Sequence, residues 1–217
     1  EHAASKKEEV IESPAQQIIS ACNTLAKAGL LGTAVGDVSV RLPDTDSILA
    51  APETVFVEQL MPRDLLEVTM DGRLLHRRGR PSFSLQMHLA VYKQRPDIHA
   101  VVHSHAPVTT VLGLCELQIP PLTFDAVPFV DLPRLPAGVP YDSQWPREVS
   151  TRLADGVPAV LLISHGAVTV GANLEQAVRR MLSLEETARI IVLCYLLQQL
   201  PAPLPPEAVE ILREALI

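Results

Sequence analysis

The sequence predicts a single α/β domain in three layers, with a mixed, mainly antiparallel sheet flanked by helices. Segments with apolar residues at helical spacing alternate with short apolar runs that are typical of strands. The pair Asp71-Gly72 lies between two such runs and is favoured in two-residue hairpin turns. Nothing in the middle of the 217 residues has the composition of a linker, so we expect one domain.

The first half of the chain begins with a charged and polar stretch, residues 1–13, which we expect to be a flexible arm. The domain itself is then expected to span residues 14–217. Helical spacing of Ile18, Cys22 and Leu25 predicts the first helix, and alternation along residues 37–41 predicts the first strand. The elements expected in this half are a helix at 14–30, strands at 37–41, 47–51, 65–70 and 73–76, a helix at 84–94 and a strand at 98–103.

In the second half, proline-rich loops over residues 119–146 separate two groups of elements. A run of apolar residues that ends at His165-Gly166 predicts one arm of a hairpin, and residues 167–170 form the other arm. The elements expected here are helices at 107–114, 145–153, 174–199 and 207–216, and strands at 124–130, 159–163 and 167–170.

Composition excludes several classes of protein. The net charge is −7 and no basic stripe stands out, which argues against nucleic acid and anionic membrane surfaces as partners. Residues 1–10 lack the pattern of a signal peptide, and residues 188–200 are too short to span a bilayer. Three widely spaced cysteines, Cys22, Cys115 and Cys194, indicate reduced, buried thiols in a cytoplasmic protein.

Three histidines carry the strongest chemical signal. His103 and His105 are two residues apart at the end of an apolar run, so on a strand they point to the same face. His165, at the end of a second apolar run, could complete a three-nitrogen site for a divalent metal. Three protein ligands leave coordination positions open for a substrate, as Lewis-acid catalysis requires. We expect Zn²⁺ here, with Mn²⁺ or Fe²⁺ as alternatives.

Several segments, taken in order, are similar to the class II aldolase/adducin family, which includes fuculose-phosphate aldolase and ribulose-phosphate 4-epimerase. The resemblance runs from about Ile18 to Leu216. The segments are Gly36-Asp-Val-Ser-Val-Arg41, Pro81-Ser82, Met87-His-Leu-Ala-Val-Tyr92, Arg95-Pro-Asp97, Ala100-Val-Val-His-Ser-His-Ala-Pro107, His165-Gly-Ala-Val-Thr-Val-Gly171 and Asn173-Leu-Glu-Gln-Ala177. The resemblance implies a homotetramer, a small-molecule substrate bound near a subunit boundary, and one Zn²⁺-type ion on His103, His105 and His165.

The chain departs from the family at the position of a catalytic carboxylate. The aldolases carry a Pro-Ser-Ser-Glu segment, where this sequence has Pro81-Ser-Phe-Ser84, so Ser84 matches the glutamate and His88 follows one helical turn later. We therefore assign Ser84 and His88 as candidate catalytic residues, with His88 either orienting a ligand or accepting a proton. An alternative is that His88 only packs against the sheet.

The resemblance also implies substrate contacts at Gly36, Asp37 and Ser82. Asp37, and Glu53 in a second matching segment, would repel a phosphate, so we expect a carboxylated or aromatic keto-compound rather than a sugar phosphate. Asp37 could instead only cap a turn. Other acids that could replace the glutamate are Asp125, Asp131 and Tyr141, whereas Glu185 and Glu186 are expected to be exposed or in subunit contacts.

Three functional classes follow. The first is a metal-dependent lyase that breaks or forms a carbon–carbon bond beside a carbonyl, as an aldolase or a decarboxylase. Decarboxylation tolerates Ser84 better, because loss of CO₂ needs no base. The second is an oxygenase with Fe²⁺ on three histidines. The third is a non-catalytic assembly protein like adducin, against which the three histidines argue.

Overall fold

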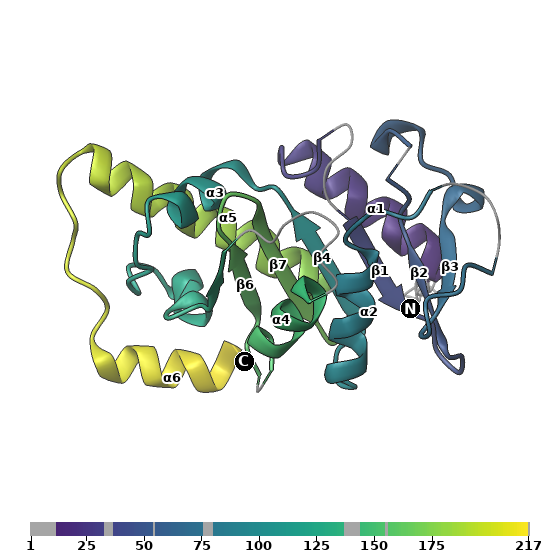
Figure 1. Cartoon of the computed structure of the whole chain (residues 1–217). Helices are drawn as coiled ribbons and strands as arrows, with labels where there is room; N and C mark the ends of the chain where they lie inside the picture. Colours follow the sequence, from purple (N-terminus) through teal and green to yellow (C-terminus); the bar gives the residue numbers. More distant parts are fainter. Residues whose placement is uncertain are drawn as a thin grey trace, which may run out of the picture.

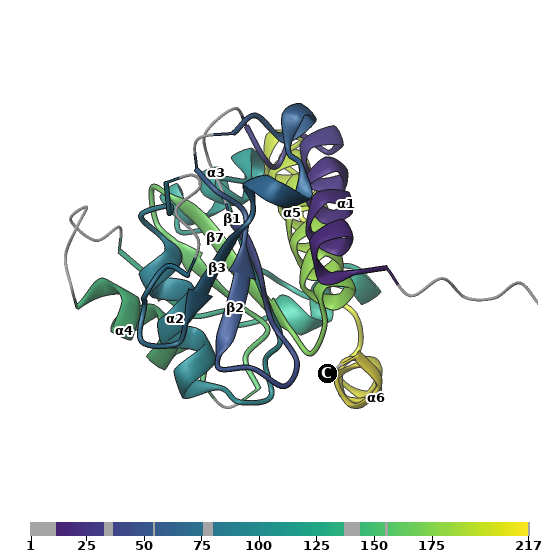
Figure 2. The ribbon, with the colours of Figure 1, turned by 90° about the vertical axis from the view of Figure 1, so that its right-hand side faces the viewer.

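A computed structural model describes residues 12–32, 37–53, 55–75, 80–136, 144–154 and 156–216. These residues form a seven-stranded sheet between two helical layers (Figures 1 and 2). The strand order is β3-β2-β1-β4-β7-β6-β5, and neighbouring strands are antiparallel except β5 and β6, which are parallel. The predicted fold class is therefore confirmed.

The helices and strands follow the order that the sequence predicts, with three differences described below. Helices are α1 (Pro14–Lys27), α2 (Leu85–Gln94), α3 (Pro107–Leu114), α4 (Trp145–Arg152), α5 (Leu174–Leu196) and α6 (Pro206–Leu216). Strands are β1 (Asp37–Arg41), β2 (Ser47–Ala50), β3 (Leu66–Thr69), β4 (Ala100–Ser104), β5 (Arg134–Leu135), β6 (Ala159–Leu162) and β7 (Gly166–Gly171). Short 3₁₀ helices are η1 (Val57–Gln59), η2 (Pro62–Asp64) and η3 (Phe124–Phe129).

Helices α1, α3 and α5 cover one face of the sheet. Helix α1 begins with a capping box in which Ser13 and Gln16 exchange side-chain to backbone hydrogen bonds, and Pro14 occupies its first turn. Its buried residues Ile18, Cys22 and Leu25 recur at helical spacing and pack in a cluster with β1, β4 and α5. In Figure 2, α1 and α5 lie side by side along this face.

Helices α2 and α4 cover the opposite face and pack against each other. The apolar part of this layer contains Leu89, Val149 and Val101 together with inward-facing residues of β2, β6 and β7. Where α2 crosses β1, however, the buried residues are polar, and this region forms part of the candidate site described below.

The strand register brings three chain segments together at one end of the central strands of the sheet. The end of β4 faces the start of β1, where Asp37 pairs with His103, and the start of β7, where Ala167 pairs with Ser104. The amino-terminal end of α2 lies over the same strand ends, as the contacts of Ser84 with both Asp37 and His103 show. Side chains that are far apart in the sequence therefore meet at the end of β4.

The strand predicted at residues 124–130 is wrong, because this segment forms η3. Its backbone makes i→i+3 hydrogen bonds, such as Ala126 N–H to Thr123 C=O, and it contains Pro128, which lacks the N–H that a central strand needs. Conversely, the two-residue strand β5 lies within the stretch predicted to be loop. The hairpin predicted around Asp71-Gly72 is reduced to the turn and a single bridge between Val68 and Leu74, and His76 lies outside the described residues.

Two predictions about burial are also corrected. Among the three free cysteines only Cys22 is buried, whereas Cys115 is exposed after α3 and Cys194 is half-buried. Glu185 is buried rather than exposed, since its carboxylate accepts hydrogen bonds from the N–H groups of Val108 and Thr109 and from the Thr109 hydroxyl. It thereby caps the start of α3. Glu186 is exposed as expected.

The predicted arm, residues 1–13, lies mostly outside the described residues, which begin at Glu12. Among the helices that the structure describes, none combines the length and hydropathy that crossing a bilayer requires.

Candidate metal centre

Three imidazoles meet at the end of β4. His103 is the penultimate residue of β4, His105 follows the strand, and His165 lies in the turn between β6 and β7. One ring nitrogen from each lies within 4.8 Å of the others. The ring centroids of His105 and His165 are 4.3 Å apart, and that of His103 is 5.1 and 5.0 Å from them. The sequence-predicted histidines are thus brought together.

The turn that carries His165 requires glycine at the next position. Ser164 and Gly166 both have positive φ, at 64° and 134°, and the His165 N–H donates to Leu162 C=O across the turn. A Cβ at Gly166 would overlap the carbonyl oxygen of Ser104 and would lie 2.8 Å from the Cα of His105. The absent side chain therefore lets β7 approach the end of β4 closely enough to bring His165 beside His105.

The cluster is suited to binding a cation. Burial, followed by the neighbouring His103 and His165, lowers the pKa of His105 to about 4, and burial and His103 lower the pKa of His165 to about 4. Both rings are therefore neutral at pH 7 and offer lone pairs. His103 is 2% exposed, and its Nε2 has no hydrogen-bond partner among the described residues. A divalent ion on these three nitrogens would satisfy that buried atom, so the residues fit a metal.

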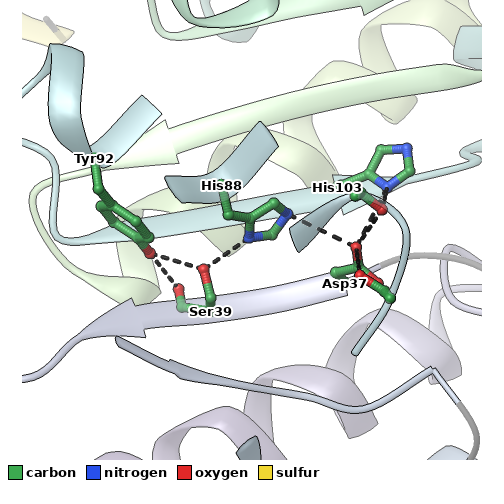
Figure 3. Close-up of polar contacts among 7 residues, drawn as sticks. Asp37, Ser39, His88, Tyr92 and His103 are labelled. Atoms are coloured by element: carbon green, nitrogen blue, oxygen red, sulfur yellow. Dashed lines mark hydrogen bonds and ion pairs between the residues drawn. The ribbon is translucent and has the colours of Figure 1, made fainter. Parts of the chain in front are cut away.

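Behind His103 lies a buried carboxylate. Asp37 is 6% exposed, and its Oδ2 accepts hydrogen bonds from the Ser82 hydroxyl at 2.6 Å and from the Ser84 hydroxyl. The same oxygen is 3.9 Å from Nδ1 of His103 (Figure 3). Burial raises the pKa of Asp37, but interactions with His103, His88 and Ser82 outweigh it and hold the pKa well below its usual range.

His88 lies on the next turn of α2 and is fully buried. Its Nε2 is 3.9 Å from Oδ2 of Asp37, and its Nδ1 is 2.7 Å from the hydroxyl of Ser39. Tyr92, one turn further, donates its hydroxyl proton to Ser39 C=O at 2.9 Å. Burial lowers the pKa of His88 to about 4, although Asp37 opposes this shift, so the ring is neutral near pH 7.

An aromatic wall flanks the histidines on one side. The indole of Trp145, at the start of α4, meets the His165 ring edge-on with centroids 5.7 Å apart. Phe83 stacks on Trp145 at 6.4 Å. These two side chains form an aromatic boundary of the site on the side of His165.

The structure therefore gathers seven of the predicted site residues: Ser82, Ser84, His88, Asp37, His103, His105 and His165. Gly36 lies outside the described residues, and so does Tyr141, while Asp125 and Asp131 are exposed on and after η3. The catalytic and substrate-binding roles assigned to these residues stay predictions. The sequence analysis missed Ser39, Tyr92 and Trp145. A usable signal for the first two was the polar residue at every second position of β1 and every fourth position of α2.

Comparison with known proteins agrees with this geometry. Residues 16–192 match the family described as Class II Aldolase and Adducin N-terminal domain, so the chain belongs to the class II aldolase/adducin family. It is 31% identical over 188 residues to 3-oxo-tetronate 4-phosphate decarboxylase of Escherichia coli O6:H1, covering 84% of this chain and 87% of the relative. It is 34% identical over 167 residues to L-fuculose phosphate aldolase of the same strain, covering 75% of each.

Solved structures agree on the fold. The crystal structure of YgbL from Klebsiella pneumoniae superposes with a TM-score of 0.83 at 29% identity, covering 92% of this chain and 97% of that chain. An L-fuculose 1-phosphate aldolase structure superposes with a TM-score of 0.84 at 23% identity, covering 93% and 95%. The similarity to aldolases and decarboxylases supports a lyase-like enzyme acting on a small molecule.

Proposed function

We propose that this protein is a divalent-metal-dependent carbon–carbon lyase of the decarboxylase type, acting on a small 3-oxo carboxylate. The observation that carries the proposal is a set of three imidazoles, each with one ring nitrogen within 4.8 Å of the others. The buried Nε2 of His103, which has no hydrogen-bond partner among the described residues, adds to it. We propose His103, His105 and His165 as the ligands and Zn²⁺ as the ion, with Mn²⁺ or Fe²⁺ behind it.

A bound divalent ion would act as a Lewis acid that stabilises negative charge developing on a substrate oxygen. The chain supplies the rest of the site. His105 and His165 are half-buried and line its open side, whereas His103 is buried against Asp37 and Ser84. Trp145, which stacks on Phe83, packs against the His165 ring and gives that side of the site an aromatic boundary.

Position 84 favours decarboxylation over aldol cleavage. Retro-aldol chemistry removes a hydroxyl proton and therefore uses a base, but a serine hydroxyl has no useful basicity near pH 7. Loss of CO₂ leaves its electron pair on the substrate carbon, and water can later supply the proton. Ser84 is also committed, because it donates its hydroxyl proton to Asp37. The identity of 31% to a decarboxylase is consistent with this choice.

Two acidic residues, Asp37 and Glu53, bear on the charge of the substrate, because the sequence predicts that they repel a phosphate. The Asp37 carboxylate is 6% exposed and accepts hydrogen bonds from two serines, so it offers little surface to a bound anion, and Glu53 is exposed. The two relatives are both named for phosphorylated substrates. We therefore propose that the substrate is a 3-oxo carboxylate, and the assay compares substrates with and without a phosphate.

The test measures CO₂ release from paired 3-oxo acids with and without a terminal phosphate, and aldehyde release from fuculose 1-phosphate. We expect metal-dependent CO₂ release that chelation abolishes and added Zn²⁺ restores. Cleavage of fuculose 1-phosphate should be slow, because a well-placed acid/base group contributes about 100- to 10,000-fold in rate. Efficient aldol cleavage would show that another residue transfers the proton. A stoichiometrically metal-loaded protein that turns over neither class would favour the non-catalytic alternative.

We also propose a homotetramer. Four leucines in the last turn of α5 and just after it are 50–73% exposed: Leu193, Leu196, Leu197 and Leu200. Such a group of exposed leucines is more apolar than a monomer surface usually leaves in water and suits a subunit contact. Light scattering at micromolar concentration should give the mass of four chains, and a monomer would exclude this proposal.

A further inference from the structure

Two rows of polar residues face each other between β1 and α2. On β1, Asp37, Ser39 and Arg41 alternate with apolar Val38 and Val40. On α2 and its N-cap, the facing residues are Ser84, His88 and Tyr92, spaced four apart. Two strand residues rise about 6.6 Å and four helix residues rise about 6.0 Å, so the two rows stay in step along their length.

Each rung of this polar ladder is a specific contact, and Figure 3 shows those that join Asp37, Ser39, His88 and Tyr92. Asp37 accepts from the Ser84 hydroxyl and lies 3.9 Å from Nε2 of His88. Ser39 contacts Nδ1 of His88 at 2.7 Å and the Tyr92 hydroxyl at 2.9 Å. Arg41 closes the row, with its guanidinium 5.2 Å above the Tyr92 ring and its Nη2 donating to Tyr92 C=O at 2.7 Å. The ladder therefore fixes the position of Asp37 from both elements.

The ladder ends at a proposed metal ligand. Asp37 pairs with His103 in the register of β1 and β4, and the Ser84 hydroxyl lies 3.2 Å from Nδ1 of His103. A serine hydroxyl has one proton to donate, and here it goes to the Asp37 carboxylate, which can only accept. Ser84 must then accept from His103, so the imidazole carries its proton on Nδ1. This tautomer leaves the lone pair on Nε2, the buried atom without a partner among the described residues.

We propose that Asp37 is a positioning residue that acts through Ser84 to fix the tautomer and orientation of His103 for the metal. The inference rests on the proposed metal-dependent function and gives Ser84 a role other than that of a missing base. Outer groups that orient a ligating histidine typically contribute about 10- to 100-fold to metal affinity. Asp37 would do so without touching the ion.

The experiment measures two quantities in each variant. Competition with a chromophoric chelator gives the Zn²⁺ affinity, and ¹⁵N NMR of the metal-free protein gives the tautomer of His103. Asp37→Asn should bind one Zn²⁺ about 10- to 100-fold more weakly and lose the pure Nδ1–H signature. Asp46→Asn, an exposed carboxylate in the turn between β1 and β2, is the matched control and should behave as the native protein. Equal affinity and an unchanged tautomer in Asp37→Asn would overturn the inference while leaving the proposed function intact.

A second pair of variants decides the matter if Asp37→Asn does not fold. Ser84→Ala removes only the bridging hydroxyl and should weaken Zn²⁺ binding to a similar extent, whereas Ser84→Thr keeps the hydroxyl and should retain most of the affinity. Identical Zn²⁺ affinities for the two would contradict a role for the bridge. If the native protein binds no stoichiometric metal, the proposed function fails, and an Nε2–H tautomer in that same protein would overturn the inference independently.

Discussion

The two faces of β1 are equally buried but chemically opposite. Val38 and Val40, at 0% and 6% exposure, pack against the α1 and α5 layer, whereas Ser39 and Asp37, also at 0% and 6%, face α2. Apolar contacts on one face need only shape, but each buried polar group on the other needs a partner, since an unsatisfied one costs about 1–3 kcal/mol. Three buried side-chain atoms without a hydrogen-bond partner among the described residues lie beside the candidate metal centre: Nε2 of His88, Nε2 of His103 and Nε1 of Trp145. One face thus supports the fold, and the other sets up the chemistry.

The largest effect is expected at Gly166, because both the packing of the sheet and the histidine cluster depend on this residue. Gly166→Ala places a Cβ against the backbone of Ser104 and His105 at a φ that side chains rarely adopt. We expect a loss of more than about 4 kcal/mol in the free energy of unfolding, together with loss of metal binding. Urea denaturation and metal analysis measure the two effects. Gly156→Ala, also at positive φ but with open space around its Cβ, is the control and should cost much less.

Removing a ligand should affect only the polar face. His103→Ala and His105→Ala should each abolish stoichiometric metal, while His99→Ala, an exposed histidine before the same strand, should bind one ion per subunit. Metal content after dialysis, measured by mass spectrometry, gives the answer. Full metal content in both ligand variants would show that the assignment is wrong.

The apolar face should respond in the opposite way. Leu25 is fully buried between α1 and the sheet, so Leu25→Ala should lower the free energy of unfolding by about 3 kcal/mol. Its affinity for Zn²⁺ should stay within twofold of native, because none of its cluster neighbours belongs to the site. A large drop in metal affinity with little destabilisation would remove the division between the two faces.

The most gradual effect concerns the pH dependence of stability, and over any one pH unit it is the smallest of those expected. The pKa of His88 is about 4 in the folded protein, whereas an unfolded histidine titrates near 6.5. Between these values only the unfolded chain binds the proton, so the free energy of unfolding falls as the pH falls from about 6.5 to 4. His88 contributes at most about 1.4 kcal/mol per pH unit to this slope. Denaturation of the metal-free protein should show a shallower slope in His88→Gln than in the native chain, and an unchanged slope would contradict the assignment.

The sequence predicted the elements and the three histidines because both depend on local spacing. Apolar periodicity located α1, α2 and α5, and the i, i+2 pattern placed His103 and His105 on one face. It failed where a pattern has two interpretations. Alternation along β1 looks the same whether its polar face meets water or another helix, so the burial of Ser39 and its contact with Tyr92 were not foreseen.

Other features depended on tertiary contacts that spacing does not encode. From its sequence position on a long helix, Glu185 resembles a surface residue. In the fold, the first turn of α3 packs against it, and two N–H groups of that turn donate to its carboxylate. Trp145 reaches His165 only because α4 packs on α2 beside the end of β4. In each case a polar or aromatic side chain is held by a partner from a distant part of the chain, and only the folded topology supplies that partner.

The close approach of β7 to β4 at Gly166 also links ligand binding to folding. His103 and His165 are 62 positions apart in the sequence (165 − 103), so the cluster exists only in chains whose β6–β7 hairpin has docked. An ion that binds this cluster and not the unfolded chain stabilises the folded state by mass action, by about 2.7 kcal/mol at a concentration 100 times its Kd. The metal would then link the end of β4 to the β6–β7 hairpin, and the concentration of free metal would help to determine the fraction of protein that is folded.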